Sequence, residues 1–223
     1  MPQLFPRAAN ALPVLTLAGV LVGAVAVIGL VWYYFSPNFY EVGYQPEQPV
    51  PYNHAFHAGQ LGMDCRYCHN HVEQSPHANI PSTQTCMNCH GQVATGSAKL
   101  LPVRESWATG VPVQWVKIHH LPDYAQFSHA THVNVGVGCE SCHGRVDQME
   151  VVYQAEPLSM GWCLDCHRNP ELNLRDPADV TVMGLNAEVR EDDETFAQYV
   201  SANQARIERE GIKPPQNCSA CHY

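Results

Sequence analysis

Charge is scarce in this sequence, and positive charge is scarcest. Only 15% of the 223 residues are charged, and 12 Lys and Arg stand against 21 Asp and Glu, which gives a net charge of −9. A protein that binds nucleic acid needs a basic face to meet the phosphates, so this balance argues against nucleic acid as a partner. Between Ala8 and Tyr40 the sequence has no charged residue at all.

This uncharged N-terminal stretch is long enough for a membrane anchor. It exceeds the roughly 20 apolar residues that a helix needs to span a bilayer, so we expect a single transmembrane helix over 12–35. Four aromatic residues, Trp32 to Phe35, end it like an interfacial belt, and Arg7 precedes it. The positive-inside rule then predicts that residues 1–11 are cytoplasmic and that the remainder lies on the periplasmic side of the cytoplasmic membrane. A cleaved signal peptide is the alternative, although the aromatic run occupies the place of a cleavage site.

No cysteine falls outside one repeated motif. All ten belong to five copies of Cys-x-x-Cys-His. Two thiols three positions apart can reach both vinyl groups on one edge of a porphyrin, and the following imidazole can then ligate the iron. The pattern therefore predicts five covalently attached haem c groups. The attachment pairs are Cys65 and Cys68, Cys86 and Cys89, Cys139 and Cys142, Cys163 and Cys166, and Cys218 and Cys221, and the iron ligands are His69, His90, His143, His167 and His222.

Two other chemistries use paired cysteines. Zinc ribbons and redox-active thiols both contain Cys-x-x-Cys, but neither requires a His after every pair. No copy ends in Lys instead of His. Multihaem nitrite reductases have such a Lys at the reactive haem, so its absence disfavours a reductase.

Eight His remain for the sixth ligand that a low-spin haem needs. Four of them lie in a repeat, aromatic-x-His-x-x-His, which ends in each copy shortly before a haem motif. Because positions i and i+3 share a helix face, each pair can serve two neighbouring haems. We expect the aromatic residue to pack against a porphyrin. The two copies are Tyr52-x-His54-x-x-His57 and Phe127-x-His129-x-x-His132.

The repeat supplies four distal ligands, and the distal ligand of the remaining haem does not follow from spacing alone. His119 and His120 are adjacent and precede the second copy of the repeat, and spacing does not choose between them. Met149 and Met160 are the rival ligands, and a thioether would raise that haem's potential. His71 and His77 are read as solvated side chains.

The fold class expected is a multihaem cytochrome c with little regular secondary structure, short helices around the haems and one N-terminal transmembrane helix. Few apolar periodic runs occur between residues 50 and 190, so we expect the porphyrins to supply most of the apolar core and the domain not to fold without them. The pattern predicts a helix over 192–210 and a loop over 170–190, and residues 91–118 are interpreted as a linker and packing segment between the two units. The expected organisation is a cytoplasmic N-terminus 1–11, transmembrane helix 12–35, linker 36–50, first di-haem unit with connector 51–118, second di-haem unit 119–170, and a tail 171–223 with a helix and the fifth haem.

Three strings of residues carry a resemblance to a known family. Together with the anchor and the His repeat, they are similar to the pentahaem cytochrome c subunit of bacterial alternative complex III. The resemblance covers nearly the whole chain and is specific from about residue 50 to 168. The strings are Gly62-Met63-Asp64-Cys65-Arg66-Tyr67-Cys68-His69, Thr85-Cys86-Met87-Asn88-Cys89-His90 and Met160-Gly161-Trp162-Cys163.

The resemblance implies an electron-transfer subunit rather than an enzyme. In that family the complex oxidises menaquinol and passes electrons through an iron–sulfur subunit to a periplasmic acceptor, a cytochrome c or a copper protein. Integral membrane and iron–sulfur subunits are the implied partners. The distal ligands carried over by motif are His54, His57, His119, His129 and His132, and the choice of His119 over His120 depends on the resemblance alone.

Two enzymatic readings remain beside the electron-transfer one. A stand-alone quinol dehydrogenase would need a quinone pocket near the membrane surface. A reductase of small nitrogen or sulfur oxyanions would need an open iron position. Spare His residues and the lack of a Lys-type motif both favour fully ligated irons.

We expect the purified protein to keep Met1 or Pro2, to require detergent and to retain its pigment in acid-acetone, because thioether bonds are covalent. Intact-mass measurement and a pyridine haemochrome assay check this, with five haems per chain as the expected count. A mass that starts near residue 40 would contradict the anchor, and a haemochrome count near zero would contradict the haem assignment.

Overall fold

The computed structural model describes residues 5–36, 41–190 and 192–222, and the chain divides into two compact parts, Met1–Glu41 and Val42–Tyr223. The described residues are helical and irregular, and their only β-pairings are isolated bridges that join Ala125 to His222 and Val137 to Leu174. The expectation of short helices without a sheet is confirmed.

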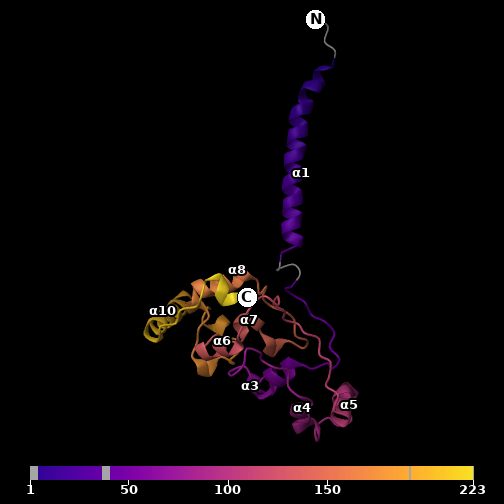
Figure 1. Cartoon of the computed structure of the whole chain (residues 1–223), viewed down its shortest axis with the longest axis vertical. Helices are drawn as coiled ribbons and strands as arrows, with labels where there is room; N and C mark the ends of the chain where they lie inside the picture. Colours follow the sequence, from indigo (N-terminus) through magenta and orange to yellow (C-terminus); the bar gives the residue numbers. More distant parts are fainter. Residues whose placement is uncertain (1–4, 37–40, 191, 223) are drawn as a thin grey trace. The chain divides into compact units, whose positions relative to one another are not determined.

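The N-terminal part is one apolar helix. A short 3-10 turn, η1 (Arg7–Ala11), leads into α1 (Leu12–Tyr34), which has a Pro in its first turn where no backbone N–H is needed. The 27 residues Ala8–Tyr34 are long and apolar enough to cross a membrane, and none of the most apolar window is buried. The predicted helix is thus present (Figure 1). Parts of the predicted cytoplasmic N-terminus and linker, residues 1–4 and 37–40, lie outside the described residues.

Short helical segments make up most of the C-terminal part. Most contain three to nine residues, and the exception is α10 with 18. In chain order they are η2 (Ala55–Gln60), α3 (Cys65–Cys68), α4 (Thr83–His90), η3 (Ala98–Leu100), α5 (Leu101–Thr109), α6 (His129–Val135), α7 (Glu140–His143), η4 (Val146–Gln148), α8 (Met160–Arg168), η5 (Pro170–Leu172), η6 (Pro177–Asp179), α9 (Leu185–Glu188), α10 (Asp193–Glu210) and α11 (Cys218–Cys221).

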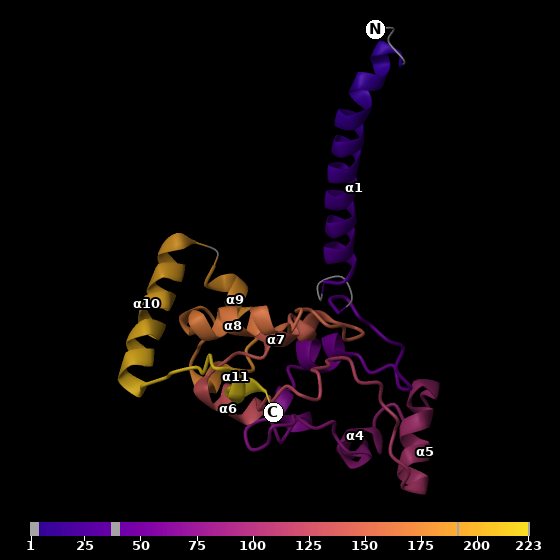
Figure 2. The same cartoon turned by 45° about the horizontal axis from the view of Figure 1, so that its top comes forward.

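The segment 91–118, predicted as a linker, contains the helix α5. Both ends of α5 have residues that are typical of helix boundaries. Pro102 lies in the first turn, and Gly110 ends the helix in the left-handed region with φ of 74°. The Thr83 and Ser106 hydroxyls are 2.7 Å apart and join α5 to α4, which lies beside it in both views (Figure 1, Figure 2). Its two buried residues, Val103 and Ser106, are too few to give a visible apolar period.

The two His-x-x-His segments dock reciprocally. The first, on η2, packs on η4, which follows the third haem motif, and the Ala55 amide donates to the Met149 carbonyl at 2.9 Å. A Cβ on Gly59 would lie only 2.3 Å from the Asp147 carbonyl oxygen, so this approach requires glycine. The second, on α6, is held by the loop after the first haem motif, because the Ala130 amide donates to the Ser75 carbonyl at 3.1 Å. Each di-haem unit therefore supports the other's ligand helix.

Helix α10 covers the segment that follows the fourth haem motif (Figure 2). Asp192 caps it by accepting from the Thr195 amide at 2.7 Å, and Gly211 ends it with φ of 65°, so the predicted helix is confirmed. Asn203 donates to the carbonyls of Leu174 at 2.7 Å and Glu171 at 2.9 Å. The segment 170–190, predicted as loop, is therefore held in place and forms η5, η6 and α9.

The apolar core of the C-terminal part is small. Among the described residues the buried apolar side chains are only Val50, Val103, Val133, Met149, Leu174 and Val180. So few residues bury too little apolar surface to offset the entropy of ordering a chain of this length. A large apolar group held inside the fold would meet this need.

We expect Asn203→Ala to lower the free energy of unfolding by about 1–3 kcal/mol, because it removes two hydrogen bonds from the Asn203 amide. The Glu171 carbonyl loses this donor, whereas the Leu174 carbonyl keeps the Tyr199 hydroxyl as a donor. Guanidinium unfolding of the haem-loaded protein measures this. Gln198→Ala is the matched control on the same helix, since the Gln198 side chain is exposed and donates to Glu194 one turn earlier. We expect a change within about 0.5 kcal/mol. Equal effects of the two substitutions would contradict the proposed role of Asn203.

Candidate functional site

Each Cys-x-x-Cys-His motif lies on a helical turn. The first, third and fifth motifs coincide with the four-residue helices α3, α7 and α11, and the other two form the ends of α4 and α8. On such a turn the two thiols, three positions apart, face the same side. This is the arrangement that attachment to one porphyrin edge requires.

The second His of each repeat lies opposite the His of a haem motif. The ring centroids of His57 and His90 are 6.2 Å apart, and those of His132 and His167 are 6.1 Å apart. Two imidazoles that ligate one metal from opposite sides, with metal–nitrogen bonds of about 2 Å, have ring centroids roughly 6 Å apart. In both di-haem units the residues therefore fit a six-coordinate haem iron at the second motif.

The first His of the second repeat shows the same spacing. The His129 and His143 rings are 6.4 Å apart and nearly parallel, with an interplanar angle of 10°. The equivalent residue of the first repeat, His54, is partly buried and close enough to His69 to interact electrostatically. The structure thus brings four of the predicted distal His close to the His of four motifs.

Backbone carbonyls fix the tautomer of six imidazoles. In each, Nδ1 lies 2.6 to 3.1 Å from a main-chain oxygen, so Nδ1 carries the proton and the Nε2 lone pair remains for a metal. The pairs are His57 with Asn53, His69 with Asn79, His90 with Val93, His129 with Pro76, His132 with Ser128, and His167 with Pro215.

Burial keeps three further imidazoles neutral. It lowers the pKa of His54 and of His119 to about 4, and that of His143 to about 3, with smaller contributions from neighbouring His. A neutral imidazole offers a lone pair to a metal, whereas an imidazolium does not. These groups are therefore in the ligating form at any pH above about 5.

The aromatic residue of each repeat stacks on an imidazole. Tyr52 lies 4.5 Å from the His57 ring at 21°, and Phe127 lies 4.6 Å from the His132 ring at 27°. Each ring stacks on the second imidazole of its repeat and meets the first edge-on. The expected packing of these rings against a porphyrin stays a prediction. The aromatic ring thus restricts the orientation of both imidazoles.

The two candidates for the remaining distal ligand, His119 and His120, have different contacts. His119 Nε2 lies 3.3 Å from His143 Nδ1 with ring centroids 4.4 Å apart, which is too close for two ligands on opposite sides of a metal. His120 directs Nε2 to the Lys117 carbonyl at 3.0 Å. The ring found beside His222 among the described residues is that of Tyr124, at 5.7 Å.

The two Met candidates differ in burial. Met149 is 5% exposed, whereas Met160 is 65% exposed. Met149 also holds η2 through its carbonyl oxygen, so its position is fixed. Of the two, Met149 is the one placed for a ligand inside the protein.

Two features of these centres could hardly be predicted from the sequence. The carbonyls of Pro76 and Pro215, which orient His129 and His167, lie 53 and 48 residues from them in the chain. A buried ion pair joins Glu140, inside the third motif, to Arg175 at 2.8 Å. An acidic residue within a haem motif could have attracted attention, whereas nothing in the pattern around Arg175 indicates burial.

Side-chain convergence bears on the zinc alternative. Within the described part of the chain no three Cys, His, Asp or Glu side chains converge as a metal site. A zinc ribbon needs four such ligands around one point. The paired imidazoles described above instead suit a metal that takes one ligand on each side.

Comparison with known proteins also indicates c-type haem binding. Residues 125–223 match the family described as "Cytochrome c7 and related cytochrome c". The "Menaquinone reductase, multiheme cytochrome c subunit" of Nitratidesulfovibrio vulgaris (strain Hildenborough) is 34% identical over 123 residues, which are 55% of this chain and 56% of that protein. The chain thus matches about half the length of this curated relative. The C-terminal part is a multihaem cytochrome domain.

We expect His57→Ala and His132→Ala each to create one haem that binds carbon monoxide in the reduced protein, because each removes an imidazole opposite a motif His. Optical titration with carbon monoxide measures the number of reactive haems. His120→Ala is the control and should bind none, like the unaltered protein. Rapid binding to the unaltered protein would contradict six-coordination.

Proposed function

We propose that this chain is a membrane-anchored pentahaem cytochrome c that serves as the electron-transfer subunit of a quinol-oxidising respiratory or photosynthetic complex. It relays electrons from quinol and iron–sulfur centres to a periplasmic cytochrome c or copper protein. The observation that carries the proposal is the repeated pairing of imidazoles at 6.1 to 6.4 Å. When bound, haem iron supplies a one-electron couple at each centre.

Each haem iron would be ligated by the His of its motif and by a second side chain, which suits electron transfer rather than substrate chemistry. We assign the pairs by the equivalence of the two repeats: the first His of a repeat serves its first motif and the second His its second motif. The pairs are His54 with His69, His57 with His90, His129 with His143, and His132 with His167. For the iron at His222 the sixth ligand is His119 by resemblance, with buried Met149 as the alternative.

Contacts between thiols of different motifs support one order of centres. Cys65 is near Cys139, Cys68 is near Cys86, Cys142 is near Cys163, and Cys163 is near Cys221, each close enough to interact electrostatically. The order that follows is second, first, third, fourth, fifth. Cys89 of the second motif and Cys218 of the fifth are the exposed thiols, so the two ends of this relay are also its most accessible centres.

The apolar helix α1 supports attachment to the cytoplasmic membrane by a single pass, with the haem domain on the periplasmic side. Integral membrane and iron–sulfur subunits are the proposed partners. The relative's name places it in a menaquinone reductase, so assembly with other subunits is the shared expectation. We propose alternative complex III as the specific assembly on the strings of residues near the first, second and fourth motifs.

A second candidate is electron delivery in the opposite direction, from a periplasmic donor to quinone. The relative named as a subunit of a menaquinone reductase favours it. The stand-alone readings, a quinol dehydrogenase or an oxyanion reductase, are less well supported. The reductase needs an open iron, whereas each repeat would supply one distal His to each of two motifs.

Co-purification in mild detergent tests the proposal. We expect the chain to be recovered with integral membrane and iron–sulfur subunits, identified by mass, and its haems to be reduced on addition of menaquinol. Recovery of the chain alone, fully active toward quinol, would reject the subunit assignment. Oxidation of pre-reduced haems by menaquinone, without reduction by menaquinol, would favour the opposite direction.

A further inference from the structure

A buried carboxylate lies inside the third haem motif. Glu140 is the residue after Cys139, and its side chain is only 3% exposed. The Gly184 amide donates to Oε2 at 2.6 Å and the Asn186 amide donates to Oε1 at 2.7 Å. These amides and the neighbouring guanidinium stabilise the charged form, and the pKa of Glu140 is lowered although burial opposes this.

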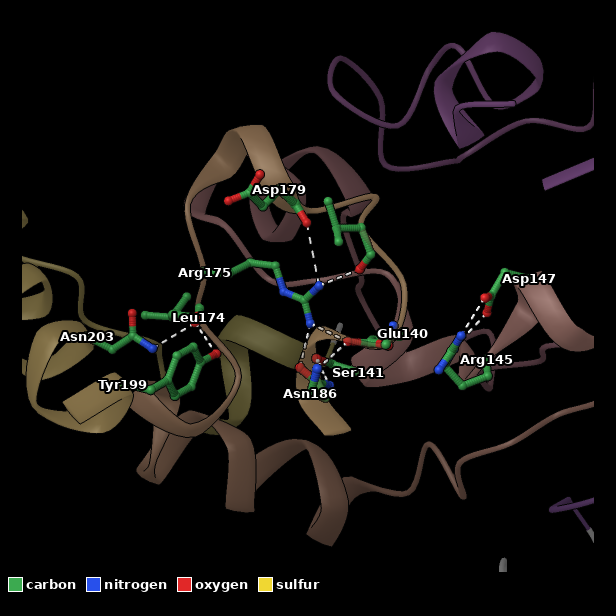
Figure 3. Close-up of polar contacts among 12 residues, drawn as sticks. Glu140, Ser141, Arg145, Asp147, Leu174, Arg175, Asp179, Asn186, Tyr199 and Asn203 are labelled. Carbon is green, nitrogen blue, oxygen red and sulfur yellow. Dashed lines mark hydrogen bonds and ion pairs between the residues drawn. The ribbon is translucent and has the colours of Figure 1, made fainter. Parts of the chain in front are cut away.

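The partner of this carboxylate is equally buried. The Arg175 side chain is 1% exposed, and its Nη2 donates to Glu140 Oε1 at 2.8 Å. Its Nη1 donates to the Val182 carbonyl at 2.7 Å. Figure 3 shows the Arg175 guanidinium beside the Glu140 carboxylate. A Cβ on Gly138 would lie 2.3 Å from the guanidinium carbon, so the guanidinium packs directly on the backbone that enters the motif.

The other acidic residue inside a motif is in a different environment. Asp165 of the fourth motif is 77% exposed, and its contact with Arg168 is long at 3.5 Å. Water screens such an exposed charge, whereas a charge in the interior acts at a lower effective dielectric. Only the Glu140 carboxylate is therefore placed to act strongly on a nearby iron.

We propose that Glu140 and Arg175 are positioning residues that set the midpoint potential of the third haem through the balance of their two buried charges. The two charges have opposite signs, so they oppose each other's effect on the iron, and the potential depends on their balance. Removal of one leaves the other uncompensated in the interior. The inference extends the proposed relay, in which the third haem is the central centre, so its potential affects passage between the two halves.

The sign of the effect separates this role from a structural one. Glu140→Gln leaves the Arg175 cation, which favours ferrous iron and raises the potential of the third haem. Arg175→Gln leaves the Glu140 anion, which favours ferric iron and lowers it. A pair that served only as packing would shift the potential in the same direction in both variants, because either loss admits water.

Redox titration of the purified haem-loaded protein, followed by optical and electron paramagnetic resonance spectra, tests the proposal. We expect one of five centres to shift upward in E140Q and downward in R175Q, each by about a tenfold change in its reduced-to-oxidised ratio, or about 59 mV for one electron. The double variant E140Q/R175Q should return close to the original value. D165N is the control, and its centre should shift much less.

Shifts of equal sign in the two single variants, or an unchanged titration in E140Q, would overturn the proposal. If R175Q is not recovered with five haems, the other two variants still test the proposal. It then requires an upward shift in E140Q and a return to the original potential in the double variant. Failure of all three to retain haem, while D165N retains it, would also overturn it in favour of a purely structural pair. The measurement uses neither quinol nor partner subunits, so failure of the proposed relay in the complex would leave its result unaffected.

Discussion

The arrangement of the C-terminal part depends on the opposition of imidazoles that come from different segments of the chain. A haem motif supplies one imidazole from its own helical turn, and the second must arrive from elsewhere at a ring separation of about 6 Å. The His57–His90 and His132–His167 pairs meet this requirement with nearly equal geometry. In the proposed assignment the two His of a repeat serve two motifs, so each repeat would fix two centres relative to one helix.

Hydrogen bonds from the backbone make this opposition specific. A free imidazole has two tautomers, and only the one with Nδ1 protonated presents Nε2 to a metal. Carbonyls of Asn53 and Ser128, four residues before His57 and His132, select it locally in both repeats. For His129 and His167 the carbonyl belongs to a distant segment, so their orientation depends on the docking of one unit against another.

Polar contacts compensate for a small apolar core. The Glu140–Arg175 pair and the Asn186 amide of α9 hold the tail against the third motif. The Asn203 side chain holds α10 against Glu171 and Leu174 within the tail. Buried polar groups of this kind are costly when left unpaired but fix one geometry when satisfied. This suits a cytochrome domain in which centres must lie at fixed separations, while the macrocycles provide apolar surface.

The residues alone were sufficient for the features with a local period or spacing: the apolar helix α1, the five motif turns, the ligand repeat and helix α10 with its Asp192 cap and Gly211 end. Only the tertiary structure decided which imidazole opposes which motif, that Tyr52 and Phe127 stack on ligands, and that α5 and the 170–190 segment are ordered. The physical reason is that these depend on contacts between residues tens of positions apart, such as Arg175 with Glu140, 35 residues away. Local propensity and periodicity contain no information about such contacts.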